Sequence, residues 1–150
     1  MAEILIVGYG NDLRSDDGAG RVVASRIEAM DLPGVVVRSQ SQLTPELALL
    51  VTRADLVVFV ADAANDPDLR PWEPLLANGP EATIARRMLV LLQPGRDRPI
   101  RDTERWLANR EIDFHAHVRE SSAADLERVV RILSGQALGL VLAGGAARGF

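Results

Sequence analysis

Short apolar runs alternate along this chain with segments of helical periodicity. The runs are rich in Val, Ile and Leu and lie at residues 3–7, 35–37, 56–60 and 88–92. An uninterrupted apolar run of this length is typical of a strand that is buried on both faces. Strand and helix in alternation favour a parallel sheet with helices on both faces. The sequence therefore predicts an α/β fold, a single three-layer domain over residues 1–150 with a mostly parallel, doubly wound sheet.

The segments between these strands carry helix signals. Thr44-Pro45 is a typical helix start, because Thr caps a helix and Pro suits its first position. Ser121 or Ser122 is expected to cap a helix that runs to Leu133 and stops at Gly135. We also predict a helix that ends near Met30, short helices at 72–76 and 103–109, an edge strand at 114–118 and a last strand at 138–142.

The composition excludes several kinds of chemistry. The chain has no Cys, which rules out disulfides, thiolate metal sites and a Cys nucleophile and fits a reducing cytoplasm. All 17 basic residues are Arg, so Schiff-base chemistry and a Lys general base are excluded. The formal net charge of −4 gives no electrostatic footprint for nucleic acid. No apolar run approaches the ~18 residues of a membrane span, and no signal peptide is evident. We expect a cytoplasmic protein, of an oligomeric state that the composition leaves open.

In parallel sheets, functional sites lie beyond the carboxyl ends of the strands. Here that rule selects the Gly8–Asp17 loop after the first strand, Asp62 after the third, and the glycine-rich Gly144–Gly149 tail. The loop does not follow the dinucleotide pattern G-x-G-x-x-G, because Leu13 occupies the third Gly position. These three places are therefore the candidates for a site of another kind.

Carboxylates gather at the first two of these places. The loop contains Asp12, Asp16 and Asp17, and Asp62 is expected to face the same crevice. Two carboxylates from separate elements, with a His as a further ligand, can bind a divalent cation. The structural alternative is a tight glycine turn, a helix capped by Asp16 or Asp17, and a loop capped by Asp62.

Residues of about 3–64 resemble the hydrogenase maturation endopeptidases. The similarity rests on the opening pattern Gly-x-Gly-Asn followed by an acidic pair and Gly, on Gln-Leu-Thr-Pro-Glu-Leu at 42–47, and on the strand at 54–60. Members of this family remove a C-terminal extension from the large subunit of nickel–iron hydrogenase after nickel is inserted. The resemblance implies a peptide hydrolase with the large-subunit precursor as its partner. It also implies nickel, which the substrate could supply, or another divalent metal.

The same resemblance assigns roles to individual residues. The metal ligands that it implies are Asp17, Asp62 and one of His115 and His117. Gly10 and Asn11 belong to the signature loop that meets the substrate, and a metal-polarised carbonyl or metal-bound water would serve hydrolysis. Val60-Ala61-Asp62 carries one residue more before the Asp than the commoner form, which would shift its direction. In the structural alternative, the histidines lie on an edge strand with one packed inward and one in solvent.

Residues of about 86–150 resemble a different family. They are similar to the region that leads into the patatin-like phospholipase domain of bacterial neuropathy-target-esterase-like proteins. The similarity rests on Val-Leu-Leu at 90–92, Trp-Leu at 106–107, His-Ala-His-Val-Arg at 115–119, the helix at 124–133 and Leu-Val-Leu at 140–142. Gly144, Gly145 and Arg148 match the oxyanion-hole motif Gly-Gly-Gly-x-Arg-Gly, with Ala146 at the third Gly. The nucleophilic Ser of a G-x-S-x-G elbow is absent from the 150 residues.

The two resemblances meet between residues 62 and 86, where a fusion seam would lie. Our main hypothesis is a metal-dependent endopeptidase, because the front of the chain carries side chains able to do chemistry. The first alternative is a fragment or fusion of a patatin-like phospholipase or esterase that lacks its nucleophile. The second alternative is a non-catalytic α/β domain.

Overall fold

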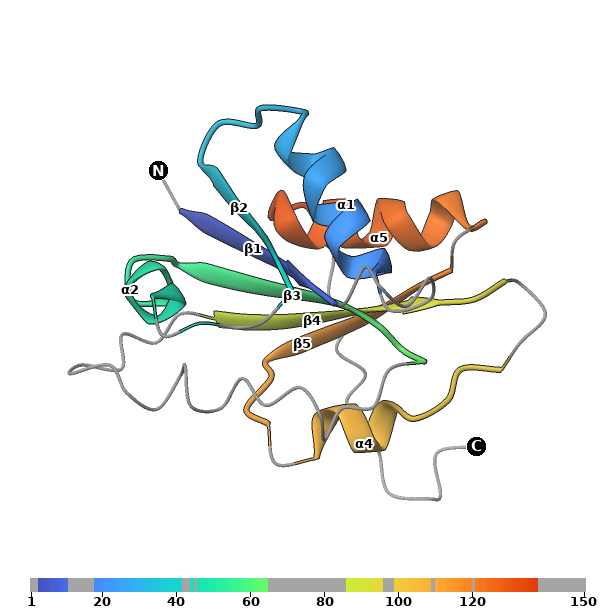
Figure 1. Ribbon diagram of the computed structural model, residues 1–150. Coiled ribbons are helices and arrows are strands. Elements are labelled where there is room, and N and C mark those ends of the chain that lie inside the picture. Colours follow the sequence, from blue (N-terminus) through green and yellow to red (C-terminus); the bar gives the residue numbers. More distant parts are fainter. Residues whose placement is uncertain are drawn as a thin grey trace, which may run out of the picture.

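A five-stranded parallel sheet forms the centre of the molecule (Figure 1). The computed structural model describes residues 3–10, 18–41, 44, 46–64, 86–95, 99–108, 110–119 and 121–137. The strands are β1 (Ile4–Tyr9), β2 (Val35–Gln40), β3 (Leu56–Asp62), β4 (Arg86–Gln93) and β5 (Phe114–Arg119). Their spatial order is β2-β1-β3-β4-β5, one of the two common doubly wound orders. The predicted α/β fold is therefore confirmed.

Helices cover both faces of this sheet (Figure 1). The helices are α1 (Ala19–Glu28), α2 (Leu47–Val51), α4 (Thr103–Leu107) and α5 (Ala123–Leu133). The α2/α4 face buries alternate strand residues such as Phe59 and Leu91, together with Trp106 of α4. The α1/α5 face buries the intervening residues such as Val58, together with Val129 of α5. Because both faces are covered, the central strands need apolar residues at every position, which explains their uninterrupted apolar runs.

The ends of the helices differ in part from the sequence prediction. Ser122 is the N-cap of α5, and its hydroxyl accepts a hydrogen bond from the Asp125 N–H at 3.2 Å. Gly18 is the N-cap of α1, so neither Asp16 nor Asp17 occupies that position. In α2 the N-cap is Glu46, because Thr44 instead forms a turn in which its carbonyl accepts from the Leu47 N–H at 3.0 Å. The predicted helix at 72–76 and strand at 138–142 lie outside the described residues.

Two glycines let α1 approach the sheet closely. A Cβ added to Gly8 of β1 would lie 2.2 Å from the Gly20 carbonyl oxygen and 2.5 Å from the Ala24 Cβ. A Cβ added to Gly20 would lie 2.4 Å from the carbonyl oxygen of Val60 in β3. Real Cβ atoms do not approach backbone atoms so closely, so only Gly fits at either position. The start of α1 thus packs directly on the backbones of β1 and β3.

This contact predicts that Gly8→Ala and Gly20→Ala are strongly destabilising. The clashes involve backbone atoms that have no room to move, so we expect each variant to lose about 3 kcal/mol or more of unfolding free energy, the upper end of overpacking costs. Urea denaturation followed by circular dichroism measures the loss. Ser25→Ala on the exposed side of α1 is the control and should change stability by no more than about 0.5 kcal/mol. A loss in Gly8→Ala as small as in the control would contradict the close packing.

Candidate functional site

The carboxyl ends of β1 and β3 meet at the point where the strand order reverses. The chain leaves β1 for β2 on one side and returns to β3 on the other, which is the place where doubly wound sheets hold their ligands. In the register, Gly8 lies opposite Val60, so Gly10 and Asp62, each two residues further on, lie at the same edge. The structure therefore brings together two of the predicted site residues.

Hydrogen bonds fix both of these residues. The Gly10 N–H donates to the Gln40 carbonyl at 3.3 Å and so continues the pairing with β2. The Asp62 carboxylate accepts from the Ala64 N–H at 2.8 Å, which turns the chain directly after β3. One Asp62 oxygen thus has the loop-capping role that the structural alternative predicted. The predicted site residues Asn11 and Asp17 lie outside the described residues.

The sequence of the loop after β1 differs from that of a phosphate-binding loop. The N-terminus of a helix such as α1 attracts anions. Residues 11–17, however, include three Asp, and the chain contains no Lys, so it has no Walker sequence G-x-x-x-x-G-K-[ST]. The loop thus has a net negative charge, with Arg14 as its one basic residue, and it lacks the Lys of a Walker sequence.

The predicted histidine ligands lie on the opposite face of the sheet from Asp62. Successive side chains of a strand point to opposite faces, so Asp62 shares the α1/α5 face with Val60. His117 lies level with Leu91 and Ala61, which pack on the α2/α4 face. The two strands that carry Asp62 and His117 are also two strand spacings apart, about 10 Å. Across the described ranges, no group of three or more His, Cys, Asp and Glu residues is placed to hold a metal.

Both ring nitrogens of His117 are engaged within the protein. Its Nδ1 lies 3.1 Å from Nε2 of Gln93, at the end of β4, and its Nε2 lies 3.3 Å from Oγ1 of Thr103, at the start of α4. A neutral imidazole satisfies both partners, because one nitrogen accepts and the other donates. His115 is exposed, with its ring centroid 5.7 Å from that of His117. This arrangement matches the structural alternative, with one His packed inward and one toward solvent.

Burial is the main cause that lowers the pKa of His117 below its usual value near 6.5. Electrostatic interactions with His115, Arg119 and Arg128 lower this pKa further, and the interaction with Asp125 opposes them. The side chain is therefore neutral at physiological pH. We conclude that His117 ties α4 to the carboxyl ends of β4 and β5.

Sequence reasoning did not identify the two partners of His117. Gln93 is a buried polar residue that closes the β4 apolar run directly before Pro94, and this position was the available signal. Thr103 follows Asp102, whose positive φ of 60° marks a sharp turn into α4. Gly144, Gly145 and Arg148 of the predicted oxyanion motif lie outside the described residues.

Comparison with known protein families favours the second of the two resemblances. The profile described as "Neuropathy Target Esterase family P-loop like domain" matches residues 41–135. The chain belongs to this family. A curated relative, "Lysophospholipase NTE1" of Yarrowia lipolytica (strain CLIB 122 / E 150), is 32% identical over an alignment that covers 66% of this chain and 10% of the relative. The chain thus corresponds to about a tenth of that relative's length. No solved structure matches the chain.

Membership of the neuropathy target esterase family supports the resemblance found in the second half of the chain. The matched range extends forward to residue 41 and includes residues 62–86, where we placed a possible seam. Neither finding shows membership of the hydrogenase maturation endopeptidases. The findings favour the phospholipase-related alternative over our main hypothesis. Among the residues that are described, no helix is long and apolar enough to cross a membrane.

The lowered pKa of His117 predicts a pH-dependent stability. Between its pKa in the folded state and about 6.5, the unfolded chain binds more protons than the folded chain. The stabilisation that neutral His117 gives to the fold is therefore complete above about pH 6.5 and is lost as the pH falls through this window. We expect the urea midpoint to decrease between pH 7.5 and pH 5, and to decrease less in His117→Gln, whose amide still donates and accepts.

His115→Gln is the matched control, because His115 lies on the same strand but is exposed. It should retain most of the pH dependence of the parent. An identical pH dependence in the parent and in His117→Gln would show that His117 is not the titrating group.

Proposed function

We propose that this chain is the P-loop-like part of a neuropathy-target-esterase-like lysophospholipase and that it is not the part that carries the nucleophile. The observation behind this proposal is the family match over residues 41–135, followed at residues 140–149 by the sequence that resembles an oxyanion-hole motif. The name of the curated relative suggests the substrate class, a lysophospholipid whose ester bond is hydrolysed.

The residues of the chain support a role beside the nucleophile. Ester hydrolysis by this class needs an activated Ser, and the G-x-S-x-G elbow is absent from the sequence. His117 is not available as a general base, because Gln93 and Thr103 engage both its nitrogens. Main-chain N–H groups around Gly144 and Gly145 would instead stabilise the oxyanion that develops during ester cleavage. Arg148 would add positive charge beside them.

The anchoring of α5 gives the domain a positioning role in this proposal. The Asp125 carboxylate accepts from the Arg119 N–H at 3.2 Å and from the Arg119 guanidinium at 3.4 Å, which ties the first turn of α5 to the end of β5. The hydrogen bond from the Arg119 N–H is the main cause that lowers the pKa of Asp125, so this carboxylate stays ionised at neutral pH. Because α5 leads toward residues 144–149, a fixed α5 would set where the oxyanion motif begins.

The proposal predicts no hydrolysis of lysophosphatidylcholine by this chain alone. It predicts turnover when the chain is continued into a patatin-like domain that carries the Ser nucleophile. In that longer protein, Gly144→Val should lower kcat on the order of a hundredfold, because it disturbs an oxyanion donor. Release of fatty acid measures both results.

Ser134→Ala, an exposed change just after α5, is the control in the longer protein and should leave kcat unchanged. Turnover by the isolated chain would contradict the assignment of a non-catalytic role. Unchanged kcat in Gly144→Val would exclude the oxyanion role of the tail.

The metal-dependent endopeptidase stays a second hypothesis, carried by the resemblance over residues 3–64 and by the placement of Gly10 and Asp62 at the reversal of strand order. It predicts that nickel or zinc binds the isolated chain and that Asp17→Ala or Asp62→Ala abolishes binding. Because the histidines lie on the other face, His115→Ala and His117→Ala should bind metal as well as the parent does. Calorimetric titration at pH 7.5 measures these affinities. Equal binding by the parent and Asp17→Ala would remove the hypothesis, and with it a hydrogenase precursor as the partner.

A further inference from the structure

The outer edge of β2 carries main-chain groups that no described strand pairs with. On its inner side, the Ile4 N–H donates to the Gly34 carbonyl at 2.9 Å and the Gly10 N–H donates to the Gln40 carbonyl at 3.3 Å. Bonds in a parallel ladder repeat every second residue, so residues 36, 38 and 40 face β1. Val35, Val37 and Ser39 therefore turn their main-chain groups outward.

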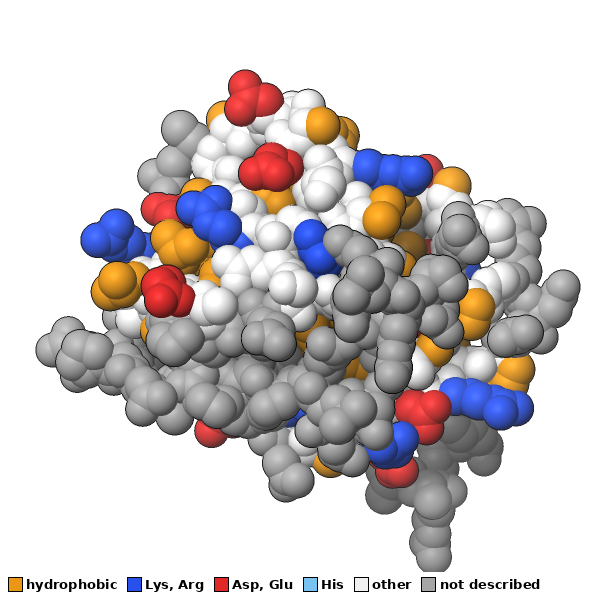
Figure 2. Space-filling view, in the orientation of Figure 1, with side chains coloured by type: hydrophobic (Ala, Val, Ile, Leu, Met, Phe, Trp, Pro, Cys, Tyr) orange, Lys and Arg blue, Asp and Glu red, His pale blue; other side chains and the backbone are white. Residues whose placement is uncertain are grey.

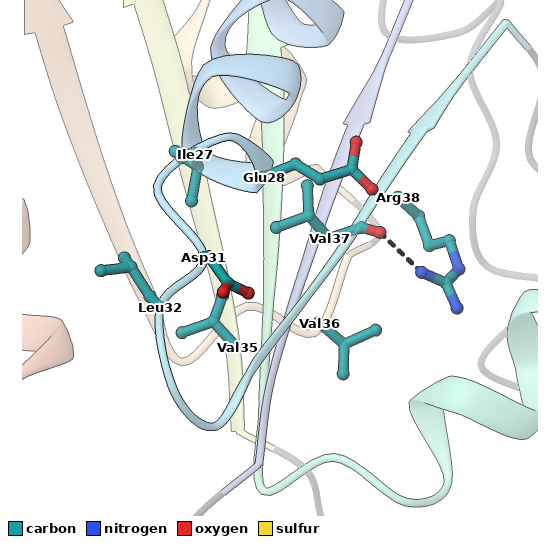
Figure 3. A pocket seen from close by; sticks show the side chains of 8 residues that line it. All are labelled: Ile27, Glu28, Asp31, Leu32, Val35, Val36, Val37 and Arg38. Atoms are coloured by element: carbon teal, nitrogen blue, oxygen red, sulfur yellow. Dashed lines mark hydrogen bonds between the residues drawn. The ribbon is translucent and has the colours of Figure 1, made fainter.

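Two of these outward groups already have partners. The Val35 N–H donates to the Leu32 carbonyl at 3.3 Å. The Arg38 guanidinium donates to the carbonyl of Val37 at 2.7 Å (Figure 3). A charged side chain placed on an exposed strand is one of the ways in which proteins limit unwanted strand pairing. The edge of β2 is thus partly protected, and the bond that protects it can be exchanged for another.

A groove accompanies this edge. The last turn of α1, the following turn and β2 enclose an open cavity of about 250 Å³ (Figure 3). Its lining is apolar at Ile27, Leu32 and residues 35–37, acidic at Glu28 and Asp31, and basic at Arg38, whose guanidinium is held by the Val37 carbonyl, so that the lining carries a net negative charge. A strand edge beside a groove is the arrangement by which proteins bind extended peptides, because the edge supplies main-chain bonds and the groove accepts side chains.

The charge of the groove selects its ligand. Within the described residues, no basic side chain forms an ion pair with Glu28 or Asp31. Glu28 is also the last residue of α1, where the helix carries partial negative charge that favours a cation. In Figure 2, carboxylates and hydrophobic side chains lie together over the α1–β2 connection at the top of the view. The complement is an extended segment with basic and apolar side chains.

We propose that the groove between β2 and the end of α1 binds an extended peptide segment with a basic side chain, which adds to the sheet as a strand beside β2. The peptide backbone bonds to the outward groups of Val37 and Ser39, and the Arg38 guanidinium releases the Val37 carbonyl. The basic side chain enters the cavity toward Glu28 and Asp31. This interaction does not depend on the proposed lysophospholipase role, and it places a partner at the edge of the sheet away from α5.

A blocked heptapeptide of alternating Val and Arg, followed by fluorescence anisotropy with the full chain, tests this site. We expect saturable binding that Glu28→Gln combined with Asp31→Asn weakens by about five- to tenfold, as two partly exposed charge pairs allow. Asn suits position 31, where φ is 47°. A heptapeptide with Glu in place of Arg is the charge control and should not bind.

Ser39→Pro tests the strand addition itself. It removes an outward N–H but no bond to β1, and edge strands tolerate Pro at such a position. We expect it to abolish peptide binding, whereas Ser39→Ala, which keeps the N–H, should bind as the parent does. If Ser39→Pro fails to fold, an N-methylated Val/Arg peptide removes the same main-chain bonds from the other side and should not bind to the parent.

Three results would overturn the proposal. These are no binding of the Val/Arg peptide, equal binding of the Glu peptide, and binding that both Ser39→Pro and N-methylation leave intact. Sedimentation of the parent tests whether a second copy of this chain occupies the edge. A dimer that Ser39→Pro converts to a monomer would assign the edge to a second copy of this chain instead of a peptide partner.

Discussion

Direct backbone contact between α1 and the sheet sets the geometry of the whole carboxyl edge. Gly8 and Gly20 leave no room for a Cβ, so the start of α1 lies against β1 and β3 at once. The two strands on which the start of α1 packs, β1 and β3, are the pair at which the strand order reverses. The loop between β1 and α1 must therefore leave and return at this point, beside Gly10 and Asp62. Any larger residue at either glycine would lift α1 from the sheet and change the place where the site can form.

The second constraint is the alternation of side chains between two buried faces. Each side chain of a strand faces one side of the sheet or the other, so the candidate site residues are divided between the two faces just as the core residues are. A residue can change faces only if the register of its strand shifts. Asp62 lies on the face of α1 and α5, whereas His117 lies on the face of α2 and α4. A metal site built from both would have to pass through the sheet. The resemblance to the maturation endopeptidases grouped them as metal ligands, and the sequence held no information on the register between β3 and β5.

Much of the fold could be predicted because it follows from local patterns. The buried strands, the edge strand β5 and the Ser122 cap of α5 are each specified by a few neighbouring residues, and the structure confirms them. The start of α2 was less predictable, because Thr44 uses its carbonyl in a turn and so shifts the cap to Glu46. The partners of His117 could not be predicted. Gln93 and Thr103 are 24 and 14 residues away, and only the packing of α4 against β4 and β5 brings them together.

The chain belongs to a family described as P-loop-like, yet its carboxyl edge differs chemically from a phosphate site. Such a site combines main-chain N–H groups with a Lys, and this chain has no Lys and three Asp in the loop after β1. The close helix–strand packing of nucleotide-binding folds is thus present without the Lys of their phosphate-binding motif. Under the proposed function, the fold would instead position the part of the chain that follows it. The bonds between Asp125 and Arg119 fix α5 to the last strand, and α5 is the element from which the chain continues toward the glycine-rich tail. In the proposed lysophospholipase, an α5 anchored in this way would position the segment that follows it, and this role needs no ligand at the carboxyl edge.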